Sequence, residues 1–231
     1  MRRVMLKLSG EALSGENSFG FDLKFVDSIC KQIKKIKSKN LQIAIMIGGG
    51  NFIRGKMLTK IDKYKADEIG MLSTYMNSLY LQSVLKLNNI SSDIYGAFPV
   101  SDMAELFSKD KAIESLNNNR VVILAGGTGH PFFTTDTGVV LRSLELECDE
   151  LLLAKSVDGV YDKDPAKYSD AKKFKKVSLQ DMVDKKLEVI DLSASVLCLY
   201  NKLNLRIFSL NEKNSIEKAV KGDNIGTLIY S

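Results

Sequence analysis

Three short apolar segments of this sequence each end in a glycine-rich turn. The segments and their turns are residues 4–8 with Ser9-Gly10, residues 41–47 with Gly48-Gly49-Gly50-Asn51, and residues 121–125 with Gly126-Gly127-Thr128-Gly129. Runs this short and this continuously apolar are typical of strands buried on both faces, as in a parallel sheet. The carboxyl ends of parallel strands lie along one edge of the sheet, so we expect the three turns to gather there.

Helical patterns alternate with these strands along the chain. Apolar residues recur at helical spacing in residues 23–36, 72–87, 104–116 and 139–146, with shorter helical segments near 179–183 and 195–202. Further strands are predicted at residues 94–98, 151–154, 205–210 and 227–230, and turns with a hairpin in residues 160–176. The alternation predicts an α/β fold, a three-layer αβα sandwich with a mostly parallel central sheet. We expect residues 1–231 to form a single domain whose C-terminal part is a sub-lobe.

The glycine turns indicate a site for phosphate groups. Glycine lets backbone N–H groups approach phosphate oxygens closely, and three such turns at one sheet edge are a stronger signal than one. Lys7 lies inside the first apolar run, where its ammonium group would reach this edge and neutralise a phosphate. The alternative for Lys7 is an edge-strand lysine that prevents aggregation, and Arg54 has the same two interpretations.

The segment of residues 127–136 is the densest in groups that bind ligands. It offers backbone donors, threonine hydroxyls and two aromatic rings, Phe132 and Phe133, which are suited to flank a flat base. A helix is expected to begin at Thr134 or Thr135, with its positive end available to an anion.

Two titratable residues of this segment have different expected roles. His130 has no Ser/Asp or Cys partner nearby in the sequence, so we interpret it as a polar lining residue rather than a general base. For Asp136 two roles are open: a cap of the helix, or a carboxylate that organises lysines and metal.

Composition narrows the classes of function. A net charge of +5 is too mild to indicate a nucleic-acid binder and suits anionic small molecules equally well. Cys30, Cys148 and Cys198 are far apart in apolar surroundings, so we expect buried thiols rather than a disulfide framework or a zinc site. Apolar runs are too short for a membrane span and charges follow Met1 too soon for a signal peptide, so we expect a cytoplasmic protein with no membrane partner.

Four motifs together resemble the bacterial UMP kinases, a branch of the amino acid kinase fold family. The motifs are K-L-S-G at residues 7–10, I-G-G-G-N-F-I-R-G at 47–55, G-T-G-H-P-F-F-T-T-D at 127–136 and V-D-G-V-Y-D-K-D-P at 157–165. The third motif is the one most specific to the UMP-phosphorylating branch. The resemblance implies transfer of the γ-phosphoryl group of ATP to UMP, with Mg²⁺ carried by the ATP phosphates rather than bound directly by the protein.

The resemblance also implies a role for individual residues. The catalytic residues would be Lys7, Asp136, Asp191 and Lys155. The ATP site would comprise Lys7, Leu8, Ser9, Gly10, Gly50, Arg54, Lys155, Ser156, Tyr161 and Asp164. The UMP site would comprise Gly49, Asp67, Thr128, Gly129, His130, Pro131, Phe132, Phe133, Thr134 and Thr135. Residues up to about 150 would form the acceptor side of the domain, and residues 151–231 the ATP-side sub-lobe.

The sequence departs from the family pattern just before Val157. The residues there are Leu153-Ala154-Lys155-Ser156, so we assign Lys155 as the second cation near the phosphates, with Ser156 as the alternative. The family also implies a homohexamer, GTP as an activator and UTP as an inhibitor. Control by GTP stays open, because relatives carry basic residues at places near which this chain has Gln82, Lys86 and Asp93, although Arg120 is kept.

Two other functions compete with this interpretation. The first is another phosphotransferase of the same fold, of the carbamate kinase or acetylglutamate kinase type. The second is a non-catalytic protein that binds a nucleotide or an oxyanion. The paired phenylalanines favour a nucleotide acceptor over a small acyl acceptor, and the combination of Lys7, Asp136 and Asp191 argues against a pure binding protein.

Overall fold

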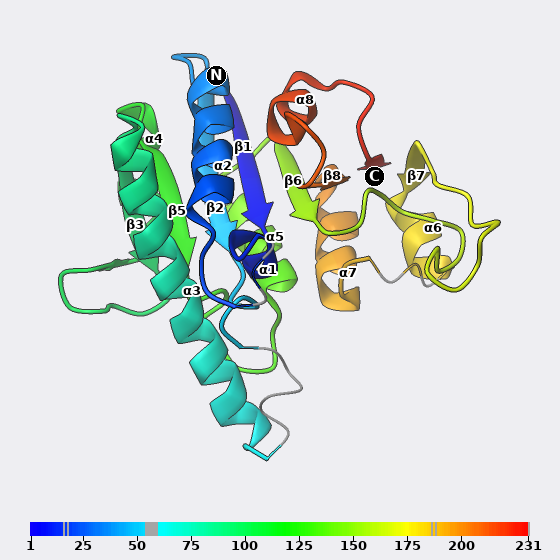
Figure 1. Cartoon of the computed structure of the whole chain (residues 1–231), viewed down its shortest axis with the longest axis horizontal. Helices are drawn as coiled ribbons and strands as arrows, with labels where there is room; N and C mark the ends of the chain where they lie inside the picture. The colour runs from blue at the N-terminus through cyan, green and yellow to red at the C-terminus, as the bar shows by residue number, and fades with distance from the viewer. Residues whose placement is uncertain (16, 18, 54–59, 186, 188, 231) are drawn as a thin grey trace.

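The computed structural model describes residues 1–15, 17, 19–53, 60–185, 187 and 189–230 (Figure 1). Arg54 lies outside the described residues, so its expected contact with ATP stays a prediction.

Among the described residues, nine strands form one sheet in the order β4-β3-β5-β2-β1-β6-β8-β9-β7. Their bounds are β1 Arg2–Leu8, β2 Leu41–Ile47, β3 Ser92–Gly96, β4 Glu105–Leu106, β5 Val121–Ala125, β6 Glu150–Lys155, β7 Lys176–Ser178, β8 Leu205–Ser209 and β9 Thr227–Tyr230. Every neighbouring pair is parallel except β8 with β9. The predicted mostly parallel sheet is therefore confirmed.

Helices cover both faces of this sheet (Figure 1). One layer contains α2 Leu23–Ile36, α3 Lys63–Leu87 and α8 Ser215–Lys221, and the other α4 Lys109–Asn117, α5 Thr135–Glu145, α6 Leu179–Asp184 and α7 Leu192–Asn201. Successive residues of each central strand point to opposite faces, so Leu6 of β1 enters the core beneath α2 and α3 while Met5 enters the core beneath α5 and α7. The three-layer αβα sandwich is thus confirmed.

Local sequence explains the best-predicted helix. Asp22 precedes α2, and its carboxylate accepts a hydrogen bond at 3.1 Å from the backbone N–H of Phe25. The buried face of α2 carries Val26, Ile29, Cys30 and Ile33.

No helix among the described residues is long and apolar enough to cross a bilayer.

The three cysteines are free and buried, as expected. Burial raises the pKa of the Cys30, Cys148 and Cys198 thiols to about 12. The thiols are therefore protonated at neutral pH and behave as small core side chains.

Three segments differ from the sequence prediction. Helix α3 begins at Lys63, nearer the amino terminus than expected, because Asp62 caps it by accepting a hydrogen bond from the Lys65 N–H at 3.3 Å. The helix predicted over residues 104–116 is wrong at its start, since Glu105–Leu106 pair with β3 at the sheet edge and tertiary pairing overrides local propensity there. In place of the turns and hairpin predicted over residues 160–176, residues 160–175 form a loop with a single antiparallel bridge, Tyr161 to Lys173, and Lys176 begins β7.

Strands β5, β2, β1 and β6 are consecutive neighbours in the sheet. Their carboxyl ends therefore place the three glycine turns and Lys155 side by side, as predicted for the turns. The backbones pack so closely that a Cβ atom on Gly10 would lie 2.2 Å from the Gly48 carbonyl oxygen. Only glycine fits at this position.

Candidate functional site

At this sheet edge, the carboxylate of Asp136 lies between two ammonium groups. Its Oδ1 is 2.9 Å from Lys7 Nζ, and its Oδ2 is 2.8 Å from Lys155 Nζ. The side chains of Lys7, Asp136 and Lys155 are only 11%, 14% and 17% exposed, so water screens these ion pairs weakly. We call these three residues the Lys–Asp–Lys cluster.

The structure resolves the alternatives that the sequence left open for this cluster. Lys7 lies in β1, between β2 and β6, so the edge-strand interpretation is wrong. Asp136 lies in the first turn of α5, whose cap is instead Thr134: its hydroxyl accepts from the Asp136 and Thr137 N–H groups. Ser156 follows β6 at the surface, whereas Lys155 takes part in the cluster.

Charge and burial act on the cluster in opposite directions. Burial by itself would raise the pKa of Asp136, but Lys7 and Lys155 more than offset this effect and hold that pKa below its ordinary value. Burial lowers the pKa of Lys155, an effect that the neighbouring Asp136 carboxylate opposes. Two lysines and one aspartate leave an excess of positive charge, which favours the binding of an anion.

Asp191 joins the beginnings of α5 and α7. Its Oδ1 accepts a hydrogen bond at 2.9 Å from the Ala194 N–H and so caps α7. Its carboxylate also accepts a hydrogen bond at 3.0 Å from the Thr137 hydroxyl, and another from the Thr134 hydroxyl. Both helices therefore direct their amino termini toward the same region of the site.

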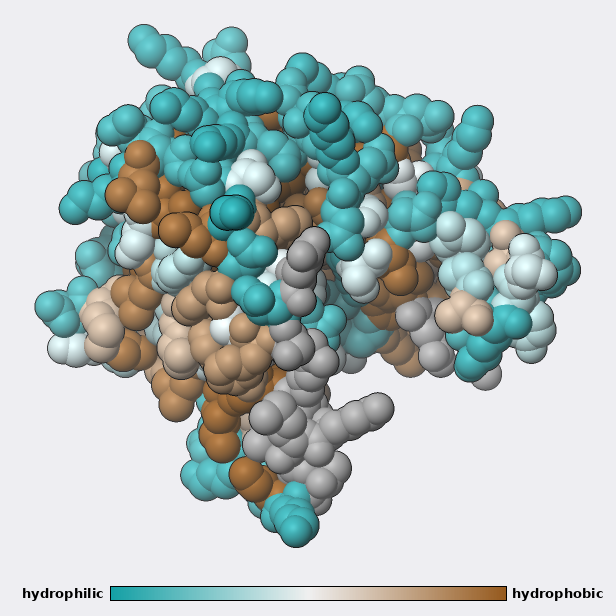
Figure 2. Space-filling view, viewed as in Figure 1, coloured by the Kyte–Doolittle hydropathy of each residue, from teal (hydrophilic) through white to brown (hydrophobic). Residues whose placement is uncertain are grey.

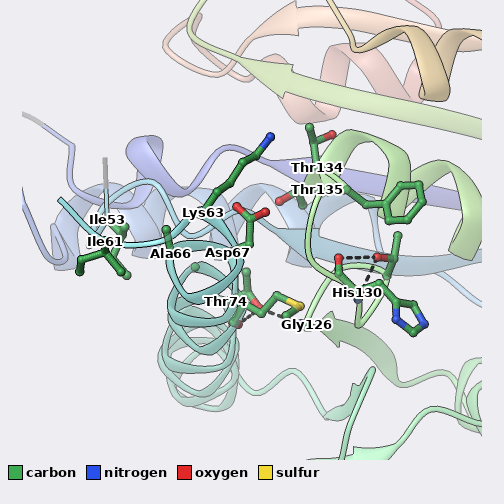
Figure 3. A pocket seen from close by; sticks show the side chains of 15 residues that line it. Ile53, Ile61, Lys63, Ala66, Asp67, Thr74, Gly126, His130, Thr134 and Thr135 are labelled. Carbon is green, nitrogen blue, oxygen red and sulfur yellow. Dashed lines mark hydrogen bonds between the residues drawn. The ribbon is translucent and has the colours of Figure 1, made fainter. Parts of the chain in front are cut away.

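A cavity of about 520 Å³ opens beside α3 (Figure 3). Six residues of the expected UMP site line it: Asp67, Thr128, His130, Phe133, Thr134 and Thr135. Gly126 and Gly127 of the turn after β5 also line this cavity, which we call the acceptor cavity. Pro131, Gly129, Phe132 and Gly49, also expected at the UMP site, are not among its lining residues.

Asp67 holds a strained part of the acceptor-side loop. Its Oδ2 accepts a hydrogen bond at 2.8 Å from the backbone N–H of Phe132, whose φ of +71° is rare for a residue with a large side chain. Phe133 lines the cavity, whereas the ring of Phe132 lies beside Lys63 and Tyr64. Of the two rings expected to flank a base, Phe133 is the one at the cavity wall.

Sequence reasoning missed Lys63, which also lines the acceptor cavity. Its Nζ lies 5.4 Å from the ring centroid of Phe132, a cation–π distance. In Figure 3 the side chains of Lys63 and Asp67 extend toward Thr134 and Thr135 across the cavity. The hydrophobic pattern of the sequence gave no signal for Lys63, because the helix that carries it was predicted to begin only at residue 72.

A second cavity, of about 400 Å³, lies on the C-terminal side of the cluster and includes Tyr161 and Asp164 of the expected ATP site. Its other lining residues are Val157, Gly159, Asp162, Lys163, Pro165, Lys185, Leu187 and Val189. Lys155 donates a hydrogen bond to the Val189 carbonyl oxygen, and Thr135, next to Asp136, lines the acceptor cavity. The Lys–Asp–Lys cluster therefore lies between the two cavities.

Polar contacts hold the loop that carries Tyr161. The Tyr161 hydroxyl donates to Asp158 Oδ1 at 2.8 Å, and Lys173 Nζ donates to Asp158 Oδ2 at 2.9 Å. The backbone N–H of Val160 donates to the buried hydroxyl of Thr227 at 2.9 Å. These contacts connect the loop to β9 and to the lysine-rich segment that follows it.

The remaining expected ATP-site residues lie along the first two turns. Leu8 is buried and its carbonyl oxygen accepts a hydrogen bond at 3.0 Å from the Gly48 N–H, which joins the two turns. Ser9 donates its N–H to the Ala154 carbonyl oxygen at 3.3 Å. A Cβ atom on Gly50 would lie 3.0 Å from Glu11 of the short helix α1 (Gly10–Leu13), so this backbone also approaches its neighbour closely.

The residues relevant to control by GTP lie elsewhere. Gln82, Lys86 and Arg120 line a cavity of about 730 Å³ near the amino end of β3. The Arg120 guanidinium donates to both carboxylate oxygens of Asp93 at 2.6 Å, and this pair lowers the pKa of Asp93. The charge of Arg120 is thus largely neutralised within the chain.

The carboxylates of the site do not form a protein cage for a metal ion. Within the described part of the chain, no group of three or more His, Cys, Asp or Glu side chains is placed to hold one. Asp136 is bound to two lysines, and Asp191 to two threonines and a backbone N–H. This donor set fits a Mg²⁺ ion that arrives with phosphate ligands of its own.

A parallel sheet with glycine turns and a Lys–Asp–Lys cluster at its carboxyl edge, between two cavities, defines an α/β protein built to bind two phosphate-bearing ligands. The amino acid kinase family model matches residues 2–209, and the chain belongs to that family.

Solved structures resemble this fold over its whole length. A UMP kinase from Bacillus anthracis is 35% identical with a TM-score of 0.95, over 99% of this chain and 96% of that chain. A UMP kinase from Ureaplasma parvum is 29% identical with a TM-score of 0.94, over 100% of this chain and 99% of that one. A uridylate kinase from Archaeoglobus fulgidus is 28% identical with a TM-score of 0.77, over 99% of this chain and 100% of that one.

Proposed function

We propose that this protein is an ATP-dependent UMP kinase. The observation that carries the proposal is the Lys–Asp–Lys cluster between two cavities, one lined by the threonine- and phenylalanine-rich segment and the other by Tyr161 and Asp164. The similarity to UMP kinases over the full chain supports the same activity.

In the proposed reaction, UMP occupies the acceptor cavity and ATP the second cavity. Thr135 would donate a hydrogen bond to the UMP phosphate, Thr128 and Thr134 would line its site, and Lys63 would add positive charge at the cavity rim. Asp67 would accept hydrogen bonds from the ribose hydroxyls while it holds the Phe132 loop. Phe133 would pack against the base.

The transfer step needs alignment and charge neutralisation more than a covalent group. An oxygen of the UMP phosphate forms a bond to the γ-phosphorus of ATP, and the bond from that phosphorus to the β–γ bridging oxygen breaks, which leaves ADP. Lys7 and Lys155 would stabilise the charge on the transferring group, with Asp136 holding both ammonium groups in place. The acceptor oxygen is already anionic, so no strong general base is required.

Mg²⁺ would enter with ATP, held by the phosphate oxygens next to Asp136, and would neutralise phosphate charge when bound. Ser9, Gly10 and Gly50 would place backbone groups around the ATP phosphates, and Tyr161 and Asp164 would contact the adenosine. Asp191 would act through Thr134 and Thr137, since it holds the beginning of α5.

An assay of ADP formation tests the proposal. Purified protein receives Mg-ATP with UMP, CMP, AMP, GMP, acetylglutamate or carbamate, each with and without GTP. We expect turnover with UMP above every other acceptor. Turnover with an acyl acceptor would instead place the protein in another branch of the family, and no turnover with any acceptor would support a binding protein.

We also propose that copies of this chain associate, as a homohexamer, through the exposed face of α3. Figure 2 shows apolar side chains gathered over this helix. Leu72, Met76 and Leu87 of α3 are 50%, 48% and 75% exposed, and Leu23 of α2 is 55% exposed. Sedimentation velocity should show a hexamer, and Met76→Glu should give smaller species.

Assays with added GTP and UTP will show whether these nucleotides activate and inhibit the protein.

A further inference from the structure

The middle of α3 carries a row of buried polar side chains outside all the motifs above. Ser73, Thr74, Asn77 and Ser78 are at most 4% exposed. Buried polar groups are costly unless they have hydrogen-bond partners. Their partners therefore show what this helix holds in place.

Asn77 holds the turn after β2. Its Nδ2 donates to the Gly48 carbonyl oxygen at 2.6 Å and to Asn51 Oδ1 at 2.7 Å, and Asn51 Nδ2 donates back to Asn77 Oδ1 at 2.9 Å. Both donors of the Asn77 amide are thus used within this turn. The backbone of α3 also approaches this turn closely, since a Cβ atom on Gly49 would lie 2.7 Å from the Gly70 carbonyl oxygen.

Thr74 holds the turn after β5. Its Oγ1 accepts a hydrogen bond at 2.7 Å from the Gly126 N–H, and its hydroxyl donates to the Met71 carbonyl oxygen at 2.6 Å. Thr74 lines the acceptor cavity, but its hydroxyl hydrogen is committed to the helix, so its polar atom acts through Gly126. Gly126 has a φ of +81°, and its carbonyl oxygen closes the turn by accepting from the Gly129 N–H at 2.9 Å.

We propose that Thr74 and Asn77 are positioning residues that together set the separation of the two phosphate-binding turns. They lie three residues apart on one face of a continuous helix, so neither turn can shift without breaking a buried hydrogen bond. The inference rests on the proposed function in one respect: it takes the turn after β5 as the acceptor side, and the turn after β2, which carries Gly49 of the expected UMP site and Gly50 of the expected ATP site, as serving both substrates. Transfer requires reacting atoms about 3–3.5 Å apart, so a small change in this separation reduces the rate.

Thr74→Val tests the acceptor-side bond, because valine keeps the shape but cannot accept from Gly126. We expect faster hydrogen exchange of the Gly126 amide, measured by NMR, and a KM for UMP raised about tenfold, with the KM for Mg-ATP changed by less than about twofold. Thr74→Ser keeps the hydroxyl and should restore both values.

Asn77→Ala tests the other bond and, unlike Thr74→Val, should act on both substrates, because the turn after β2 carries both Gly49 and Gly50. We expect a kcat reduced about tenfold, with raised KM values for both Mg-ATP and UMP. Ser78→Ala is the matched control, because Ser78 is 0% exposed and donates only to the Thr74 carbonyl oxygen within α3. It should leave all three kinetic constants unchanged at a temperature where every variant is folded by circular dichroism.

The outcomes separate this inference from the proposed function. Unchanged Gly126 exchange in Thr74→Val, or equal effects of both variants on both substrates, would overturn the positioning role. A wild-type protein without UMP kinase activity would overturn the proposed function, and Gly126 exchange would then decide by itself whether Thr74 anchors the turn.

Discussion

On the acceptor side of the site, Thr74 is only 4% exposed and holds the glycine turn by accepting a hydrogen bond from the Gly126 N–H. On the ATP side, Asp158 and Lys173 hold the Tyr161 loop with side chains that are 46% and 38% exposed, and Thr227 provides one buried anchor. Water and salt screen the second kind of contact far more than the first. The comparison indicates a preformed acceptor side and an ATP-side loop that adjusts at small cost.

The largest expected effect is at the cluster between the two sides. Lys7→Ala removes positive charge beside the transferring phosphoryl group and should reduce kcat by about 10²-fold or more. Steady-state assays with saturating UMP and Mg-ATP measure it. The control is Lys31→Ala, since the Lys31 side chain on α2 is 65% exposed and pairs only with Asp27 among the contacts the structure describes. Equal activity of the two variants would remove Lys7 from the mechanism.

The second-largest effect is expected from Asp67→Asn, which should affect only the acceptor side. The substitution weakens the acceptor of the Phe132 N–H and of the ribose hydroxyls, so we expect the KM for UMP to rise about tenfold. Calorimetric titration of UMP and of an ATP analogue measures each affinity separately. A loss of ATP affinity instead would mean that the two cavities have been assigned the wrong way round.

Lys63→Met should have a smaller effect on the same side. It keeps an unbranched side chain but removes a partly solvated charge at the cavity rim, so we expect the KM for UMP to rise about threefold to tenfold, less at high ionic strength. Lys65→Met is a close control, because Lys65 lies on the same helix turn, is 64% exposed and pairs with Glu68. Identical kinetics for the two variants would exclude a role for Lys63.

The smallest effect is expected on the ATP side. Asp158→Asn removes the charge that pairs with Lys173, so the KM for Mg-ATP should rise only about twofold in low salt and less in high salt. An effect as large as that of Asp67→Asn would contradict the contrast between the two sides. Asp110→Asn, at an exposed position of α4, is the control.

The Asp158 carboxyl also leads to a prediction of how the stability of the protein changes at acid pH. Burial would raise the pKa of Asp158, but its bonds with Lys173 and Tyr161 outweigh this and lower it. A carboxyl with a lowered pKa in the folded state stabilises the protein above its ordinary pKa, and this contribution is lost as the pH falls through the lowered value. Wild-type protein should therefore lose more stability than Asp158→Asn when the pH falls below about 4. The melting temperatures of both proteins, measured across this pH range, test the prediction.

The comparison also shows which parts of the site were accessible to prediction. The carboxyl ends of β1, β2 and β5, the glycine turns that follow them and the start of α5 at Thr135, one of the two expected positions, follow from local patterns and were predicted correctly, whereas β3 ends at Gly96 rather than at residue 98. Lys63, Thr74 and Asn77 were not identified as functional, because a polar residue inside a helical pattern looks the same whether it is solvated or buried against another segment. The two roles of Asp136 likewise could not be separated until both lysines were seen beside it.

The sequence by itself determined the alternation of the main strands and helices, though not the short edge strands β4 and β7, together with the buried parallel character of the sheet and the glycine turns that follow its strands. Hydrophobic periodicity and backbone freedom at glycine are properties of neighbouring residues, so they can be found along the chain. Only the tertiary structure decided that Lys7 is internal to the sheet, that Asp136 joins two lysines and that α3 holds both turns. Those facts depend on which strands become neighbours, because parallel strands bring together residues that are distant in sequence.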